Sequence, residues 1–403
     1  MKTIGCKQWI CLLGLVGALG GAGTCGAQTA NPVRLGWIGP LTGASADFGI
    51  PMLNGAKLAV DEINAAGGYL GRPLELIIKD DTANPEVGLR RSQELIKDGV
   101  VATIGFCNTG VAMKSLEVFQ TAKSPLIVPC ATGTPITSKY PAPESYIFRT
   151  SARDAIQAPF VVDDIVARGW TRVAIFADTS GYGESGLQDV IKALEAKKLK
   201  PVHVARFALG VKDLTAELKA AQAAGANVIF SYTVGQENAV IALGRQALGW
   251  KVTQVGPWSL SLPFFLDGAG EAADGSLMAQ TFIAEPSNER RRAFLSAYAA
   301  KYKTSKITVP MAAAQAYDSV YLLTYAILNI RTGDLAGPSV KLALETLARA
   351  YYGVTATHER PFSKDDKDAV SSNMLVMGMV KNGAVTFAYP EDRTRNLFVQ
   401  RKQ

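Results

Sequence analysis

Short runs of apolar and β-branched residues alternate along this chain with longer segments in which apolar residues recur every three or four positions. Runs of the first kind are typical of buried strands, and segments of the second kind are typical of amphipathic helices. Strands joined through helices pair in parallel, because the helix carries the chain back to the starting edge of the sheet. The alternation therefore predicts an α/β fold built on parallel sheets.

The alternation starts at residue 33, restarts after residue 150, and so predicts two doubly wound sheets. For the first half we expect strands at 33–39, 74–79, 100–106, 125–129 and 146–150, and helices at 54–64 and 85–97. For the second half we expect strands at 172–177, 202–207, 227–232 and 252–255, with helices at 154–168, 183–197, 214–224 and 238–248. A chain of 403 residues is long enough for two such lobes.

In the later segments we expect the chain to pass back from one lobe to the other. We expect a strand at 277–282, helices at 289–301, 311–329 and 340–350, and a hairpin formed by 374–379 and 384–387. No low-complexity linker separates the halves in the sequence. Structured crossovers are therefore expected to join the lobes.

The first 27 residues have the layout of a secretory signal peptide. Lys2 and Lys7 precede an uncharged run at 9–23, and small residues surround Ala27, where we expect cleavage. Cys25 leaves open a lipid-modified amino terminus, although the residues before it fit that signal poorly. Loss of two lysines and no acids lowers the net charge from +7 to +5. No later apolar stretch approaches the roughly 20 residues of a membrane span, so we expect an exported, soluble protein.

The basic balance does not point to nucleic acid. The longest basic runs, at 197–200 and 290–292, lie in helix-like segments without interleaved aromatic residues, which is typical of a solvated helix face. Export of the chain also separates it from nucleic acid, so we expect no such partner.

Two cysteines, Cys107 and Cys130, remain after the leader, and each ends a predicted strand. If the strands are neighbours, their spacing of about 4.8 Å is compatible with a disulfide, while two free buried thiols are the alternative. His203 and His358 are the two histidines of the sequence, so a metal site of histidine and cysteine is not expected.

Enzyme motifs find weak support. The sequence GYGESG at 181–186 follows a predicted strand and has the spacing of a dinucleotide-binding turn. Tyr182 and Glu184, however, crowd the place where a pyrophosphate needs bare backbone. The sequence contains no nucleophile elbow, phosphate-binding loop or zinc-protease motif. We therefore expect a protein that is not an enzyme and that has no cofactor.

The loops after the predicted strands favour a ligand cleft, because open α/β sheets bind ligands at the carboxyl ends of their strands. Hydroxyl and backbone N–H groups at two helix starts would cradle a carboxylate, and aromatic rings would enclose an apolar part. The threonines could instead be plain helix caps, and the rings could fasten loops to the core. The residues are Phe48, Asn108, Thr109, Ala131, Thr132, Tyr182, Gln236 and Trp258.

The ordered motifs of the chain resemble those of the leucine/isoleucine/valine-binding family of type I periplasmic solute-binding proteins, which serve ABC importers. The resemblance covers nearly all of the mature chain and rests on GPLTG at 39–43, DEINAAGG at 61–68, KDD at 79–81, FRT at 148–150, YG at 182–183 and AYD at 316–318. It implies two Rossmann-like lobes joined by three crossovers near 149–153, 278–283 and 352–359. Lobe 1 would comprise 28–150 and 283–352, and lobe 2 would comprise 151–282 and 353–403.

The resemblance also implies roles for the site residues. Asn108 and Thr109, with Ala131 and Thr132, match the loops that grip the ligand carboxylate, and Phe48 and Tyr182 match the rings that close over it. Gln236 falls in a further contact loop. Trp258 departs from the family, whose amino-acid binders commonly place there an acid that pairs with the ligand ammonium. Asp178 or another acid could supply that charge.

The expected function is that of a periplasmic, monomeric binding protein that captures a small carboxylate solute and delivers it to a membrane permease. The Trp258 departure favours an aromatic or keto acid over an α-amino acid, because an unpaired buried ammonium is costly. A sensor subunit for a signalling partner, or an exported enzyme on the same fold, are the alternatives.

Overall fold

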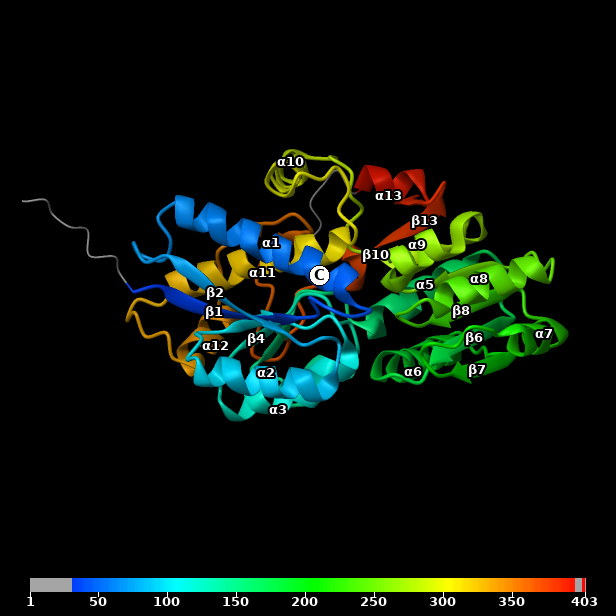
Figure 1. The fold of residues 1–403 in the computed structure, drawn as a ribbon, viewed down its shortest axis with the longest axis horizontal. Helices are drawn as coiled ribbons and strands as arrows, with labels where there is room; N and C mark the ends of the chain where they lie inside the picture. Colours follow the sequence, from blue (N-terminus) through cyan, green and yellow to red (C-terminus); the bar gives the residue numbers. More distant parts are fainter. Residues whose placement is uncertain (1–30, 396–400, 403) are drawn as a thin grey trace, which may run out of the picture.

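The computed structural model describes residues 31–395 and 401–402. The predicted signal peptide, including Cys25 and Ala27, lies outside the described residues. The chain folds into two α/β lobes set end to end, as Figure 1 shows. None of the helices in the described part is long and apolar enough to cross a membrane.

Lobe 1 is built on a five-stranded parallel sheet with the order β2-β1-β3-β4-β5. Helices α1 and α11 pack against each other over one face, and α2 and α3 cover the other. The strands are β1 (Val33–Gly39), β2 (Leu74–Asp80), β3 (Thr103–Gly105), β4 (Leu126–Val128) and β5 (Ile147–Arg149). The helices are α1 (Ala46–Ala65), α2 (Pro85–Lys97), α3 (Thr109–Thr121), α4 (Pro135–Ser138), α10 (Glu289–Tyr302), α11 (Pro310–Leu328) and α12 (Gly337–Glu345).

Lobe 2 is built on a seven-stranded sheet with the order β14-β13-β10-β9-β8-β6-β7. Strands β6 to β10 are parallel, and the hairpin β13–β14 adds two antiparallel strands. The strands are β6 (Val173–Asp178), β7 (His203–Phe207), β8 (Val228–Tyr232), β9 (Thr253–Gly256), β10 (Leu277–Gln280), β13 (Val376–Lys381) and β14 (Ala384–Phe387). The helices are α5 (Asp154–Ala167), α6 (Gly181–Ala196), α7 (Thr215–Ala223), α8 (Glu237–Ala247), α9 (Pro263–Ala269) and α13 (Pro390–Arg395).

The predicted fold class is confirmed, and the largest local difference concerns α1. The sequence predicts a loop through Phe48, whereas α1 begins at Ala46 and includes that ring. Phe48 and Met52 stand one helical turn apart and are both buried, so core contacts extend the helix backwards. Gly49 makes this possible, because a Cβ there would lie 1.7 Å from the carbonyl oxygen of Pro40.

Three crossovers join the lobes, after β5, after β10 and before β13. The chain before the last crossover still packs on lobe 1. Phe362 stacks edge-on against Phe148 with ring centroids 5.0 Å apart. Residues 367–369 run beside β5, where the Arg149 N–H donates to the carbonyl of Lys367 at 2.8 Å. A short ladder, β11 (Tyr351–Tyr352) with β12 (Thr357–His358), precedes this segment. We therefore propose that lobe 1 extends to about Asp368, beyond the boundary at residue 352 predicted from the sequence.

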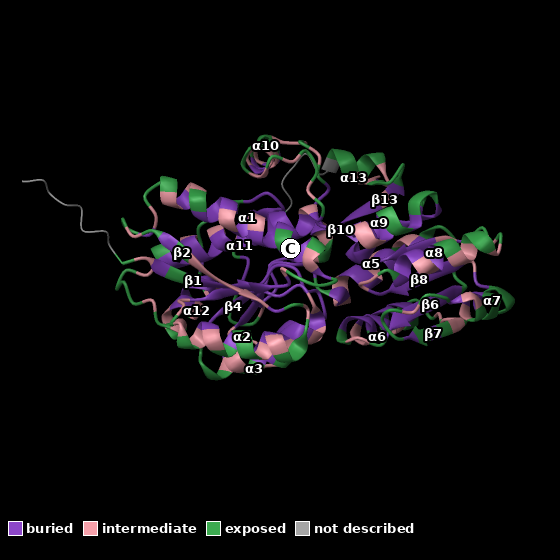
Figure 2. Ribbon diagram, in the orientation of Figure 1, coloured by how far each residue is buried: buried purple, intermediate pink, exposed green. Residues whose placement is uncertain are grey.

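The strand order reverses once in each sheet, and the helices α3 and α6, which follow β3 and β6, contact each other across the lobes. In lobe 1 the reversal lies between β1 and β3, and in lobe 2 it lies between β6 and β8. Ligands of open α/β sheets bind outside the carboxyl ends of strands at such reversals. Figure 2 shows buried residues running through both sheets and across the junction of the lobes. The fold therefore directs attention to the loops at that junction.

Candidate functional site

The indole of Trp258 links the two lobes. It opens a 3₁₀ turn at Trp258–Ser261 in lobe 2, yet it packs within the hydrophobic cluster of lobe 1 and is 4% exposed. Its Nε1 donates to the Thr132 hydroxyl at 3.2 Å, and its ring meets Phe48 edge-on at 6.5 Å. Its backbone N–H donates to Oε1 of Gln157 at 3.1 Å. Trp258 therefore makes the central contact of the closed cleft.

The residues of the predicted carboxylate cradle lie at and around the start of α3. Thr109 is buried, and its hydroxyl accepts the Gly133 N–H at 3.2 Å, which ties the two predicted gripping loops together. The Asn108 amide donates to the Ser45 hydroxyl at 3.3 Å. Within the described chain its side chain does not cap α3, and its buried Oδ1 has no hydrogen-bond partner. The N–H groups of the first turn of α3 are therefore left for an anion.

The second gripping loop is held by its backbone. Ala131 is buried, and its N–H donates to the carbonyl of Phe106 at 3.0 Å. The carbonyl of Thr132 accepts the backbone N–H of Asp154, at the start of α5, at 2.9 Å. Since α5 belongs to lobe 2, Thr132 contacts the opposite lobe through its backbone as well as through its hydroxyl.

A buried acid at the start of α5, Asp154, lies beside this loop. Its Oδ1 accepts from the Gln157 amide at 3.2 Å, while Oδ2 has no partner of ordinary geometry among the described residues. Burial raises the pKa of Asp154 to about 7; the Thr132 hydroxyl and Arg149 oppose the rise, and the charge of Asp189 adds to it. The sequence feature that could have indicated Asp154 as a site residue is its position, since it is an acid in the first turn of the helix that follows the first crossover.

Tyr182 lies near Asp154 in the part of the cleft formed by lobe 2. Its ring is 5.0 Å from that of Tyr232, and both are buried. Burial, followed by the neighbouring carboxyl of Asp154, raises the pKa of both phenols well above the ordinary value. Neither hydroxyl, nor that of Ser259, has a hydrogen-bond partner of ordinary geometry in the described chain. Several buried hydroxyl groups thus lie around Asp154 that could form further hydrogen bonds.

Asp178 has a structural role. Its carboxylate accepts the backbone N–H groups of Ser180 at 2.8 Å and of Val234 at 3.3 Å, which holds two loops of lobe 2. Asp154 contacts Thr132 directly, because its backbone N–H donates to the Thr132 carbonyl. Asp154 is therefore better placed than Asp178 to supply the negative charge that a ligand ammonium would need and that Trp258 lacks.

Packing explains the glycines of the GYGESG segment. A Cβ on Gly183 would lie 2.1 Å from the carbonyl oxygen of Asp178, and one on Gly186 would lie 2.0 Å from the Tyr232 ring. The hydroxyl of Ser180 accepts the N–H groups of Tyr182 and Gly183, so the start of α6 already has its cap. These contacts account for the motif without a dinucleotide.

Gln236 is the predicted site residue that the structure does not bring to the others. Its side chain is exposed and accepts a hydrogen bond from Lys212 at 3.0 Å. The next residue, Glu237, is buried and accepts the Gly210 N–H at 2.6 Å, so it anchors the loop and leaves Gln236 facing solvent.

Cys107 and Cys130 are both buried and are free thiols in the structure. The two cysteines lie just beyond the ends of the paired strands β3 and β4, and the Cys130 thiol neighbours that of Cys107. Burial, followed by the adjacent thiol of Cys130, raises the pKa of Cys107 well above its ordinary value. The disulfide considered from the sequence therefore stays a prediction.

We expect this bridge to form when the protein is in an oxidising compartment, because the two thiols are neighbours. Protein unfolded without reductant should then show no thiol that reacts with an aromatic disulfide reagent. Reduction should lower the unfolding free energy by about 2–3 kcal/mol, and Cys107→Ser should behave like the reduced protein. Two reactive thiols in the unreduced, unfolded protein would contradict the bridge.

A small cavity lies beside Trp258. It offers about 10 Å³ to the centre of a water molecule, which is room for about one water. Its lining residues come from both lobes and from the crossovers: Cys130, Thr132, Ala152, Gln157, Trp258, Thr281, Met311, Ala312 and Gln315. This cavity has no room for a solute of the size of an amino acid or an aromatic acid.

Known proteins with similar sequences and folds agree with this architecture. The model of a family described as periplasmic binding protein matches residues 32–384. The Leu/Ile/Val-binding protein homolog 3 of Brucella melitensis is 30% identical over 269 residues, which cover 66% of this chain and 72% of that protein.

Two solved structures show the same fold. A type 1 periplasmic binding protein from Bordetella pertussis has a TM-score of 0.80 at 21% identity, covering 89% of this chain and 99% of that one. An ABC transporter solute-binding protein from Rhodopseudomonas palustris, solved with 3,4-dihydroxybenzoic acid, has a TM-score of 0.74 at 23% identity, covering 88% and 95%. The chain therefore belongs to the type I periplasmic binding proteins of the leucine/isoleucine/valine-binding family.

Proposed function

We propose that this protein is the extracytoplasmic solute-binding subunit of an ABC importer and that it captures a small carboxylate between its lobes. The observation that carries the proposal is the uncapped start of α3, where Asn108 leaves first-turn N–H groups facing the junction with lobe 2. Such a helix start favours an anion. The relatives, which are binding proteins for solutes of this kind, support the same function.

The second part of the proposal concerns the body of the solute. Trp258 and Phe48 meet edge-on next to the cradle, so separation of the lobes would expose two aromatic surfaces there. Such surfaces suit a planar ring. The R. palustris protein is a precedent for an aromatic acid on this fold. We therefore propose an aromatic acid, or a keto acid with an aromatic body, as the solute.

A branched-chain amino acid is the second candidate, because the B. melitensis relative is named for leucine, isoleucine and valine. Asp154 is the observation in its favour. It is fully buried beside Thr132, and among the described residues its Oδ2 has no hydrogen-bond partner of ordinary geometry. An ionised Asp154 could pair with a ligand ammonium.

The two candidates predict opposite pH dependence. The raised pKa of Asp154, about 7, means that the free protein holds this proton below pH 7 and loses it above. A solute with a carboxylate alone would raise this pKa further, take up a proton on binding, and bind more weakly as pH rises from 6 to 8. An α-amino acid would lower the pKa, release the proton, and bind more tightly over the same range.

Titration calorimetry with benzoate, a phenyl keto acid, phenylalanine and leucine, each at pH 6 and pH 8, tests the proposal. We expect the two acids without an ammonium to bind, more tightly at pH 6, and leucine to bind at least tenfold more weakly. Asp154→Asn, which keeps the size of the side chain, should remove the pH dependence. Tight leucine binding that strengthens with pH would overturn the aromatic-acid assignment.

The mechanism follows from the contacts across the junction. We propose that lobe 1 captures the solute and that the lobes close about the crossovers, since ligand contacts from both lobes favour the closed form. The closed protein would then dock on a membrane permease as a periplasmic monomer without enzymatic activity. Solute-stimulated ATP hydrolysis by the reconstituted importer tests this role, and no stimulation by a bound solute would favour a sensor instead.

A further inference from the structure

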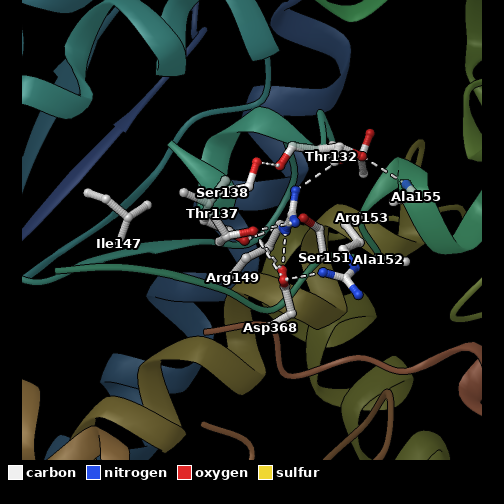
Figure 3. Close-up of polar contacts among 12 residues, drawn as sticks. Thr132, Thr137, Ser138, Ile147, Arg149, Ser151, Ala152, Arg153, Ala155 and Asp368 are labelled. Atoms are coloured by element: carbon white, nitrogen blue, oxygen red, sulfur yellow. Dashed lines mark hydrogen bonds and ion pairs between the residues drawn. The ribbon is translucent and has the colours of Figure 1, made fainter. Parts of the chain in front are cut away.

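A buried arginine holds the backbone of the second gripping loop. Arg149 ends β5, is 0% exposed, and is surrounded by acceptors, as Figure 3 shows. Its Nη1 donates to the carbonyls of Thr132 at 2.9 Å and Gly133 at 2.8 Å. These carbonyls belong to the loop that contacts Trp258 and Thr109. Arg149 itself is not among the residues that line the cavity at Trp258.

The other nitrogens of the guanidinium fix its plane. Nε donates to Oδ1 of Asp368 at 2.6 Å, and Nη2 donates to the Thr137 hydroxyl at 2.6 Å. The Thr137 hydroxyl also lies 3.2 and 3.1 Å from the two oxygens of Asp368, to which it donates. An arginine presents several donors in one rigid plane, whereas a lysine presents a single flexible ammonium. This set of acceptors therefore requires the guanidinium fork.

The same side chain joins two crossovers. Arg149 lies where the first crossover begins, and Asp368 lies where the chain leaves lobe 1 for the last one. The Ala369 N–H donates to the Arg149 carbonyl at 2.8 Å, so backbone bonds reinforce the ion pair. The loop at 131–134 is thus tied through one buried group to two of the three crossovers, the first and the last.

We propose that Arg149, locked by Asp368, is the positioning residue of the ligand loop at 131–134 and sets ligand affinity without touching the ligand. By holding the carbonyls of Thr132 and Gly133 it orients the Thr132 hydroxyl toward the Trp258 indole and the Gly133 N–H toward the Thr109 hydroxyl. The effect on affinity rests on the proposed solute-binding function, but the effect on the loop does not.

Arg149→Lys is the main test, because it keeps the charge opposite Asp368 and removes the fork. We expect at least a tenfold loss of affinity for the solute that binds best in calorimetry. We also expect the indole ¹⁵N–¹H resonance of Trp258, assigned by its loss in Trp258→Phe, to shift in the ligand-free variant. Arg153→Lys is the matched control. Arg153 approaches Oδ2 of Asp368 at 3.5 Å, is partly exposed, and among the described residues makes no hydrogen bond to the loop through its side chain, so neither quantity should change.

The Trp258 resonance and amide hydrogen exchange at 131–134 need no ligand, so they decide the positioning role even if no tested solute binds. An unmoved resonance and unchanged exchange in a folded Arg149→Lys protein would overturn the proposal. If that variant does not fold, Asp368→Asn serves in its place, because it keeps the volume and weakens the lock. It should give the same shift and faster exchange, and the absence of both would again overturn the proposal.

Discussion

Replacement of Gly181 by leucine is expected to hold the lobes apart and to weaken solute binding about a hundredfold, with little change in the unfolding temperature. Gly181 begins α6, is exposed at the rim of the cleft, and faces Gly110 in α3 of lobe 1. A Cβ at Gly181 would lie 3.2 Å from the Cα of Gly110. An alanine already needs a shift of a few tenths of an ångström there, and we expect the longer, branched leucine side chain to need a larger one while the lobes are closed.

The loss follows from the smaller population of the closed form, because apparent affinity falls in proportion to the fraction that can bind. Calorimetry gives the affinity, and small-angle scattering in saturating solute gives the radius of gyration, which should stay at its larger, open value. Gly181→Ala is the matched control and should lose less than tenfold. A leucine variant that still becomes compact with solute and binds with unchanged affinity would show that this contact is not part of closure.

Trp258→Ala is the second substitution with a large expected effect, again about a hundredfold in affinity. Trp258 is almost fully buried against lobe 1, and the edge contact with Phe48 and the bond to Thr132 exist only while the lobes are together. Loss of the ring burial, the aromatic pair and the hydrogen bond together costs about 3 kcal/mol of closure.

Trp258→Phe separates these contributions, because it keeps an aromatic contact and removes the indole N–H. We expect a loss of about fivefold, which corresponds to one hydrogen bond of about 1 kcal/mol. Thermal unfolding of both variants controls for damage to lobe 2. If Trp258→Ala bound solute more tightly than the natural protein, the indole would be an occupant that the solute has to displace and not a clamp.

The sequence predicts well the helices and strands whose ends are determined by residues close to them in the chain. Helix α2 and strands β1 and β14 agree with their predicted bounds at both ends, because apolar spacing, a proline in the first turn and the Asn382-Gly383 turn all act within a few residues. The start of α1 was missed because it depends on the packing of Phe48 and on the close approach of Gly49 to Pro40.

The same distinction applies to the site. Asn108, Thr109, Thr132, Phe48 and Trp258 were predicted because each follows the carboxyl end of a strand or faces one, and the structure brings them together. The role of Arg149 could not be inferred, because its partner Asp368 is 219 positions away and the bond depends on the path of the last crossover. Gln236 occupies an equally plausible loop but faces solvent, since a neighbouring buried glutamate decides which side chain points inward.

The interleaving of the two lobes along the chain has a consequence for how the protein matures. The sheet of lobe 2 begins at Val173 and is completed by β13 and β14, after the chain has returned to lobe 1 for α10, α11 and α12. Before that hairpin arrives, β10 is an open sheet edge with unpaired backbone groups, a template for unwanted strand pairing. Lobe 2 therefore cannot complete its sheet until the chain of lobe 1, which ends at about Asp368, has been made. Until the hairpin is in place, the open edge of β10 is where an incomplete chain can pair with another strand.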